Sequence, residues 1–98
     1  MSELTTYEGG EFLTSHEAVA EYLNLALQDE DSAVFIRALG DAARARGMTE
    51  VANLTGIDRS TLYRCLSGNH DTGLSVIFRV LQALGTGLSA NQRMQETS

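Results

Sequence analysis

The stretch Met48–Ser67 (MTEVANLTGIDRSTLYRCLS) constrains the fold more than any other part of the chain, because its pattern is that of two short helices joined by a tight turn. Thr49 is a suitable N-cap for the first helix and Asp58 for the second, since short polar side chains accept hydrogen bonds from the free N–H groups of a helix start. Gly56 stands where the chain must turn sharply and a positive φ is needed. Ile57 is apolar and can fill the corner of this turn.

The two helices of this stretch separate apolar from polar side chains. Ala52 is small at the point where the backbones of two crossing helices come close. On the second helix the inward positions are Leu62, Cys65 and Leu66, and the outward positions are Arg59, Ser60, Tyr63, Arg64 and Ser67. Guanidinium, hydroxyl and phenol groups can reach base edges and phosphates, so the pattern indicates a DNA-binding helix-turn-helix. From the residues alone, an ordinary helical hairpin with a solvated polar face is an equal alternative.

Length and composition indicate one helical, globular domain. A chain of 98 residues can bury a core of its own, and its 43% hydrophobic content is that of a globular protein. Proline is absent and only 6% of the residues are aromatic, which favours helices. Neither an apolar run long enough to cross a membrane nor an export leader is evident, and the one cysteine, Cys65, excludes an internal disulfide. We expect a soluble cytoplasmic protein without membrane association.

The formal net charge of −6 disfavours nucleic-acid binding by the chain as a whole, but the charges are segregated. Residues 1–31 carry eight acidic residues and no arginine or lysine, whereas residues 32–98 carry seven arginines and five acidic residues. Exposed charges more than about 8–10 Å apart are largely screened at physiological salt, so the acidic third does not exclude DNA contact elsewhere. Two interpretations of this third stay open: a surface for a basic partner, or a solvated helix face.

Hydrophobic periodicity predicts three further helices around the motif. Thr14 and Glu17 have the spacing of a capping box at the start of the first, and Ser32 is the expected cap of the second. Glycines at positions 47 and 85 are expected to end the second and fifth helices. The fifth helix is expected to bury Leu74, Ile77, Phe78, Leu81 and Leu84. The expected ranges are 15–28, 33–46, 49–55, 59–66 and 74–84.

These elements suggest one helix-turn-helix domain over residues 13–90, with the motif at 48–67. A flexible acidic arm (1–12) is expected before it, and a frayed tail (91–98) after it. Residues 86–90 can form a short strand, which would need a partner such as the same segment of a second subunit. Dimerisation through the fifth helix, through residues 86–90 or through both is compatible with the sequence.

No group of residues has the spacing of a catalytic or metal site. His16 and His70 lack a second ligand at metal spacing, and the acidic residues 29–31 do not follow a calcium-loop pattern. Cys65 is expected to be a small buried hydrophobe, since no neighbouring base is implied. We therefore expect no enzyme, no metal and no cofactor.

Four segments of the chain resemble the HigA-type addiction-module antidotes, small prophage-associated proteins with a lambda-repressor-like (Cro/C1, XRE-type) helix-turn-helix. The segments are AEYLNLALQDED (20–31), FIRALGDAARARGM (35–48), GIDRSTLYRCLSG (56–68) and VLQALG (80–85). The resemblance covers about residues 13–90. Its most specific part is the combination of ARARGM before the motif with LYRCLSG at its end.

The resemblance implies an all-α, five-helix lambda-repressor-like domain that acts as a homodimer. It further implies an antitoxin of a type II toxin–antitoxin module, which neutralises a RelE/HigB-like toxin (a basic ribosome-associated mRNA ribonuclease) and represses the shared operon. For a dimer we expect a palindromic double-stranded operator. Two alternatives stay open: a stand-alone prophage-type repressor without a toxin, and a protein whose main role is to bind a toxin through residues 1–31.

Carried over by position, the resemblance places Arg59, Ser60 and Arg64 at base edges, and Thr49, Thr61 and Ser67 at phosphates. From its outward position Tyr63 is added to the base-reading set, and Asn69 in the following loop to the phosphate-contacting set. The family usually has proline and serine before the fifth helix, where this chain has Thr72 and Gly73, so we expect a looser loop there. The chain has no lysine, and the bidentate fork of arginine suits guanine O6 and N7, so we expect specificity to be favoured over general phosphate affinity.

Overall fold

The computed structural model describes residues 15–69 and 71–90, and this part of the chain forms five helices and no strand. The helices are α1 (His16–Ala26), α2 (Ser32–Arg46), α3 (Met48–Thr55), α4 (Arg59–Cys65) and α5 (Leu74–Ala83). The predicted all-α class is confirmed, and each predicted boundary lies within two residues of the observed one. The expected arm (1–12) and tail (91–98) lie outside the described residues.

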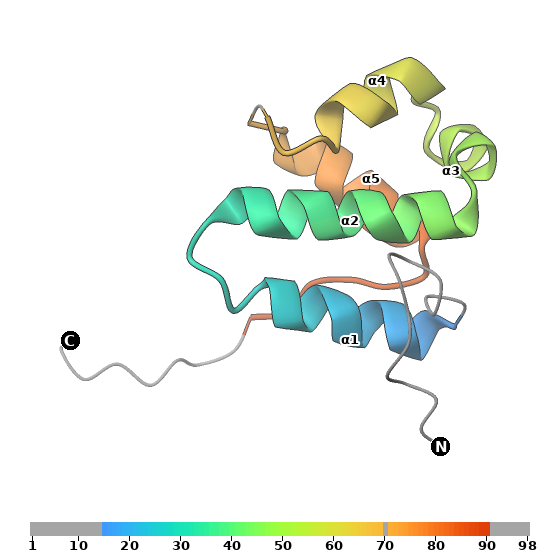
Figure 1. The fold of residues 1–98 in the computed structure, drawn as a ribbon. Coiled ribbons are helices and arrows are strands. Elements are labelled where there is room, and N and C mark those ends of the chain that lie inside the picture. Colours follow the sequence, from blue (N-terminus) through green and yellow to red (C-terminus); the bar gives the residue numbers. More distant parts are fainter. Residues whose placement is uncertain (1–14, 70, 91–98) are drawn as a thin grey trace, which may run out of the picture.

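The helix α2 lies at the centre of the molecule (Figure 1). α1 packs along one side of α2, α3 and α4 lie on the opposite side, and α5 lies behind it. Every helix contributes to one core, whose most completely buried large side chains are Leu39, Val51, Leu62, Val80, Leu81 and Leu84. Burying such a side chain contributes about 1.5–3 kcal/mol, so this core fixes the position of α4 relative to the other helices.

The first two helices begin at polar caps. The Ser15 hydroxyl oxygen accepts a hydrogen bond of 3.0 Å from the backbone N–H of Ala18, so the cap of α1 is Ser15 rather than the expected Thr14, and the helix begins at His16. For α2 the prediction was wrong: the cap is Asp31, whose carboxylate accepts from the N–H of Ala33, and Ser32 is already helical. Aspartate is at least as good a cap as serine, and it starts the helix one residue earlier. Thr14 of the expected capping box lies outside the described residues.

The start of α3 also differs from the prediction. Gly47 (φ +114°) ends α2 and directly precedes α3, which begins at Met48. Thr49 is therefore inside the first turn of α3, and no side chain caps this helix, because the chain re-enters the helix directly after Gly47. The cap of α4 is confirmed: Asp58 has extended backbone angles, and its carboxylate accepts from the N–H of Thr61.

The loop between α4 and α5 is bonded to α4 at Thr72, and the expectation that it is looser than in the family stays a prediction. The Thr72 hydroxyl donates to the carbonyl oxygen of Cys65, which attaches the loop to the end of α4. Gly73 precedes α5 without a side-chain cap, so the expected helix start is confirmed. Gly85 ends α5 with φ +77°, and residues 86–90 then run along α1 without regular secondary structure (Figure 1). Within the described residues no strand forms at 86–90, and pairing of this segment with a second subunit stays a prediction.

Candidate nucleic-acid interface

The turn between α3 and α4 is closed by a buried threonine. Thr55 is 9% exposed, and its hydroxyl donates to the carbonyl oxygen of Val51 at 2.8 Å. The same oxygen accepts from the N–H of Ile57 at 3.2 Å, across the left-handed Gly56 (φ +78°). Ile57 is half-buried against the core, as expected for the residue that fills the corner. These contacts fix the direction in which α4 leaves the turn.

The two leucines on the inward side of α4 are buried as its sequence predicts: Leu62 is completely buried and Leu66, just after the helix, is 3% exposed. Cys65 differs from the prediction, since it was expected to be buried and is half-buried with a free thiol. The four residues assigned to base reading, Arg59, Ser60, Tyr63 and Arg64, are all exposed to solvent. α4 therefore presents two cations, a hydroxyl and a phenol on a helix whose other face is anchored in the core.

Two hydroxyls at the start of α4 are bonded to the capping carboxylate. Ser60 donates to Asp58 Oδ2 at 3.0 Å, and Thr61 donates to Asp58 Oδ1 at 2.8 Å. The hydrogen bonds from Thr61 and Ser60 lower the pKa of Asp58 below its usual value of 3.8. A contact from the Thr61 hydroxyl to a phosphate requires this bond to Asp58 to break, since a hydroxyl has only one proton to donate.

The remaining phosphate candidates lie at two places. Ser67 is half-buried, and its hydroxyl donates to the carbonyl oxygen of Arg64 at 2.9 Å and accepts from the N–H of Asn69 at 3.2 Å. Asn69 and Thr49 are exposed, the first in the loop after α4 and the second in the first turn of α3. Thr49 and Asn69 thus face solvent, whereas the hydroxyls of Thr61 and Ser67 are bonded within their own segment.

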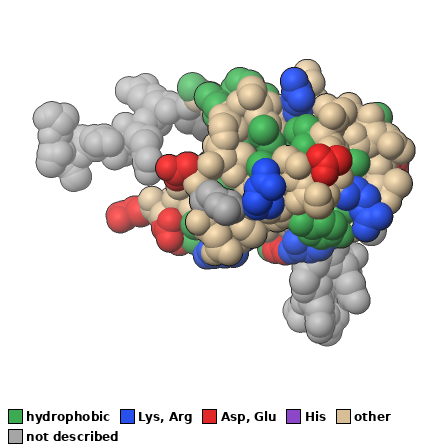
Figure 2. All heavy atoms as spheres, turned by 90° about the horizontal axis from the view of Figure 1, so that it is seen from above, with side chains coloured by type: hydrophobic (Ala, Val, Ile, Leu, Met, Phe, Trp, Pro, Cys, Tyr) green, Lys and Arg blue, Asp and Glu red, His purple; other side chains and the backbone are tan. Residues whose placement is uncertain are grey.

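The arginines of the described residues fall into two groups. Arg44 pairs with Asp41 within α2, and Arg46 pairs with Glu50 on α3 at 3.5 Å. The other four, Arg37, Arg59, Arg64 and Arg79, form no ion pair with any residue that the structure describes. Seen from the α4 side, arginines occupy several separate points of the surface, while acidic side chains gather mainly toward one edge (Figure 2). The positive charge of α4 is therefore free to meet an anion.

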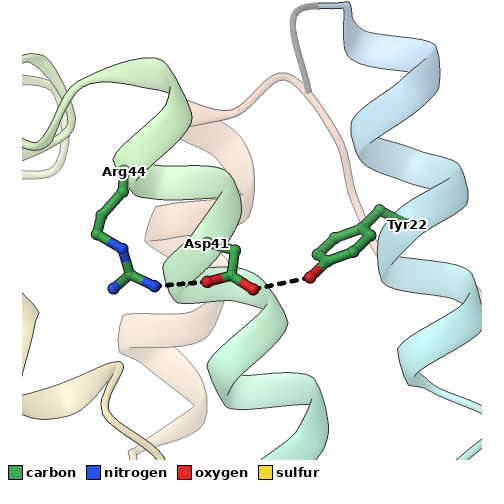
Figure 3. Close-up of polar contacts among 3 residues, drawn as sticks. All are labelled: Tyr22, Asp41 and Arg44. Atoms are coloured by element: carbon green, nitrogen blue, oxygen red, sulfur yellow. Dashed lines mark hydrogen bonds and ion pairs between the residues drawn. The ribbon is translucent and has the colours of Figure 1, made fainter. Parts of the chain in front are cut away.

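A polar contact between α1 and α2 was not expected from the sequence. The Tyr22 hydroxyl donates to Asp41 Oδ2 at 2.7 Å, and the Arg44 guanidinium donates to Asp41 Oδ1 (Figure 3). Burial and, second, the bond to Asp41 raise the pKa of Tyr22 to about 12. Tyr22 follows the buried Val19 by three residues, a spacing typical of an apolar helix face, so the sequence of α1 gives no sign of a polar partner.

The apolar surface of α5 is larger than predicted. Leu74 and Phe78 were assigned to the buried stripe, but they are 60% and 50% exposed. The buried stripe is formed by Ile77, Val80, Leu81 and Leu84. Leu74 and Phe78 stand one turn apart beside this stripe, and nothing in the described part of the chain covers them, so α5 carries an apolar patch.

Of the two histidines considered for metal binding, the structure describes only His16. His16 is exposed and lies against Gly85, and His70 lies outside the described residues. Within residues 15–69 and 71–90, no three histidine, cysteine or acidic side chains are grouped as metal ligands. None of the described helices is both long and apolar enough to cross a lipid bilayer.

Comparison with known proteins places the chain in a family. A family model described as a probable addiction module antidote protein matches residues 3–92. A protein of Haemophilus influenzae, described only as uncharacterized, is 37% identical over 90 residues, which cover 92% of this chain and 93% of that protein. No solved structure matches the chain. Since the family model spans nearly the whole sequence, the chain belongs to the family of probable addiction module antidote proteins.

Proposed function

We propose that this chain is a HigA-type antitoxin of a type II toxin–antitoxin module, with an XRE, lambda-repressor-like helix-turn-helix in α3 and α4. In this proposal it binds its operator in the cytoplasm, represses its own operon, and neutralises a RelE/HigB-like toxin. It acts by binding and catalyses no reaction. The observation that supports DNA binding most is that α4 is anchored by Leu62 while Arg59 and Arg64 face solvent without an ion pair to any described residue.

Base recognition is proposed for the outward face of α4. The guanidinium fork of arginine matches the O6 and N7 acceptors that guanine presents in the major groove. Arg59 lies at the start of α4 and Arg64 in its last turn, so the two can contact base pairs at both ends of the helix. Tyr63 and Ser60 share this face, and Thr49 and Asn69 flank it as phosphate contacts.

A homodimer is part of the proposal because one domain offers few phosphate contacts and the chain is acidic overall. The patch of Leu74 and Phe78 on α5 is the apolar surface that we assign to the dimer contact, since burying it in a second copy removes it from water. Two copies of α4, held about 34–36 Å apart, would meet successive turns of the major groove. This spacing predicts a palindromic operator.

Toxin binding is proposed for α1 and the acidic turn that follows it. Glu17 and Glu21 are exposed on α1, Asp29, Glu30 and Asp31 follow it, and Leu25 is 72% exposed. α1 lies on the opposite side of α2 from α4 (Figure 1). A basic protein can therefore contact α1 through charge and one apolar anchor while α4 stays on DNA.

DNA binding can be tested by fluorescence anisotropy with the duplex that the chain selects from a random pool. Arg59→Ala and Arg64→Ala should each weaken binding by roughly 1–3 kcal/mol and relax base preference. Arg79→Ala is the matched control, because Arg79 is exposed on α5 and likewise has no ion pair with a described residue. If both α4 variants bind like the unmodified chain, α4 does not contact the bases.

The two alternatives are distinguished from the proposed function by their binding to a toxin. A stand-alone repressor binds DNA in the same way but has no protein partner, so toxin co-purification separates it from an antitoxin. A protein whose main role is toxin capture forms a salt-sensitive complex with its toxin that survives the loss of Arg59 and Arg64.

A further inference from the structure

Arg37, a residue of α2, lies against the loop that follows α4. At Gly68, φ is +84°, and a Cβ added there would lie 2.7 Å from Arg37 Cγ and 3.0 Å from Arg37 Nη1. The stem and guanidinium of Arg37 thus cover the backbone of Gly68. α2 also approaches the end of α4 closely, since a Cβ added at Gly40 would lie 2.8 Å from the carbonyl oxygen of Leu66.

The charge of Arg37 is not neutralised by a described residue. Arg37 is exposed, and it forms no ion pair within residues 15–69 and 71–90. The acidic residue one turn along α2, Asp41, already accepts from Tyr22 at one carboxylate oxygen and from Arg44 at the other (Figure 3). Arg37 is therefore a cation without an acidic partner in the described part of the chain.

The side chain of Arg37 lies near the C-terminal end of α4. Arg64 lies in the last turn of this helix, and its carbonyl oxygen accepts from Ser67, which in turn accepts from the N–H of Asn69. This chain of hydrogen bonds fixes the loop on which Arg37 rests. A cation from α2, an exposed amide at position 69 and the arginine of α4 are thus brought to one end of the proposed recognition helix.

We propose that Arg37 is a backbone contact of the DNA interface, which binds a phosphate beside the end of α4. This inference rests on the proposed function. Because Arg37 comes from outside α4, it lies beside that helix rather than on its base-facing surface, and a helix in the major groove is flanked by phosphates. The contact adds affinity without sequence preference. Gly68 positions Arg37, since a side chain at this left-handed residue would occupy the space of the arginine stem.

The test is the dependence of duplex binding on salt concentration, measured by anisotropy with full-length chains. Each phosphate contact contributes about 0.9 to the slope of log K against log salt. Arg37→Ala should reduce the slope by about that amount per chain, equally on the selected duplex and on a scrambled one. Arg37→Lys should keep most of the slope because the charge remains, and Arg79→Ala should leave it unchanged.

The role of Gly68 is tested by Gly68→Ala, with its folding checked by circular dichroism. If the added methyl acts by displacing Arg37, the single variant Gly68→Ala binds the duplex more weakly than the unmodified chain. The double variant Arg37→Ala/Gly68→Ala should then bind no more weakly than Arg37→Ala alone. An unchanged slope for Arg37→Ala, with Arg59→Ala still weakened, overturns the assignment of Arg37 alone. Failure of the unmodified chain to bind any duplex overturns the proposed function, and this inference with it.

Discussion

The phenol of Tyr22 on α1 and the carboxylate of Asp41 on α2 are joined by a hydrogen bond of 2.7 Å (Figure 3). This bond connects the helix proposed to bind the toxin to the helix that supports the DNA-binding unit. It also uses one of the two oxygens of Asp41, and Arg44 uses the other. This hydrogen bond thus holds α1 in place on α2.

We expect the contribution of Tyr22 to the free energy of unfolding to be lost at alkaline pH. Its pKa rises from 10.0 to about 12 in the folded chain, chiefly because the phenol is partly buried and secondly because it is bonded to Asp41. A raised pKa means that this contribution is fully present below pH 10 and is lost as the pH rises toward 12. Tyr22→Phe should cost about 1 kcal/mol at pH 8, since it removes one partly exposed hydrogen bond to a charged group. Urea unfolding between pH 8 and 12 checks this, and an equally steep alkaline loss in Tyr22→Phe would contradict it.

The contribution of the Asp58 cap to the stability of the fold should be lost at low pH, the opposite of the dependence expected for Tyr22. Hydrogen bonds from Thr61 and Ser60 lower its pKa, so its contribution is present above the unfolded pKa and is lost as the pH falls through the lower folded value. Asp58→Ala should lower the melting temperature by a few degrees at pH 7, whereas Asp58→Asn keeps the cap. Differential scanning calorimetry measures the melting temperature of both variants at pH 3 and pH 7, and the lower melting temperature of Asp58→Ala should be evident at pH 7. A melting temperature for Asp58→Ala equal to that of the unmodified chain would show that the cap does not stabilise α4.

Anchoring of α4 depends on Leu62, which is completely buried. Leu62→Ala should destabilise the fold by about 2–5 kcal/mol, because it removes apolar contacts and leaves a cavity. Leu25→Ala is the control: the same chemical change at a residue 72% exposed should cost less than about 0.5 kcal/mol. The free energy of unfolding in urea measures both, and equal losses at the two positions would argue against the packing described for α4.

Dimer formation is tested at the apolar patch of α5. Phe78→Asp should shift the dimer to monomer, because burial of a carboxylate against a second copy is unfavourable. Leu25→Asp places the same charge on an exposed residue of α1, outside the patch, and should leave the dimer intact. Sedimentation equilibrium gives the mass of each variant. A dimer that persists in Phe78→Asp would contradict the dimer contact proposed for α5 and would favour residues 86–90 as the contact.

The sequence predicts the five helices and the faces of α4 because both depend on local patterns. Leucine spacing, the Asp58 cap and the Gly56 turn each act within a few residues, and the structure confirms them. The cap of α2 was misassigned because two adjacent residues, Asp31 and Ser32, are both good caps, and local preference does not separate them.

The missed features depend on contacts between segments far apart in the sequence. The partner of Tyr22 is nineteen residues away, and Arg37 meets a loop that begins only after α4. Leu74 and Phe78 are exposed because the core contacts only part of the apolar face of α5. The periodicity of the sequence predicts this face but not the width of the part that is buried. Contacts of the base- and phosphate-binding candidates with DNA stay predictions.

The most direct measurement is a pull-down of the tagged full-length chain from its native host at low salt, with mass spectrometry of the bound protein and sequencing of the bound DNA. The predicted result is a stoichiometric small basic protein together with DNA enriched in one palindromic site near the gene of this chain. Recovery of the chain without such a protein and without enriched DNA would contradict a DNA-binding antitoxin.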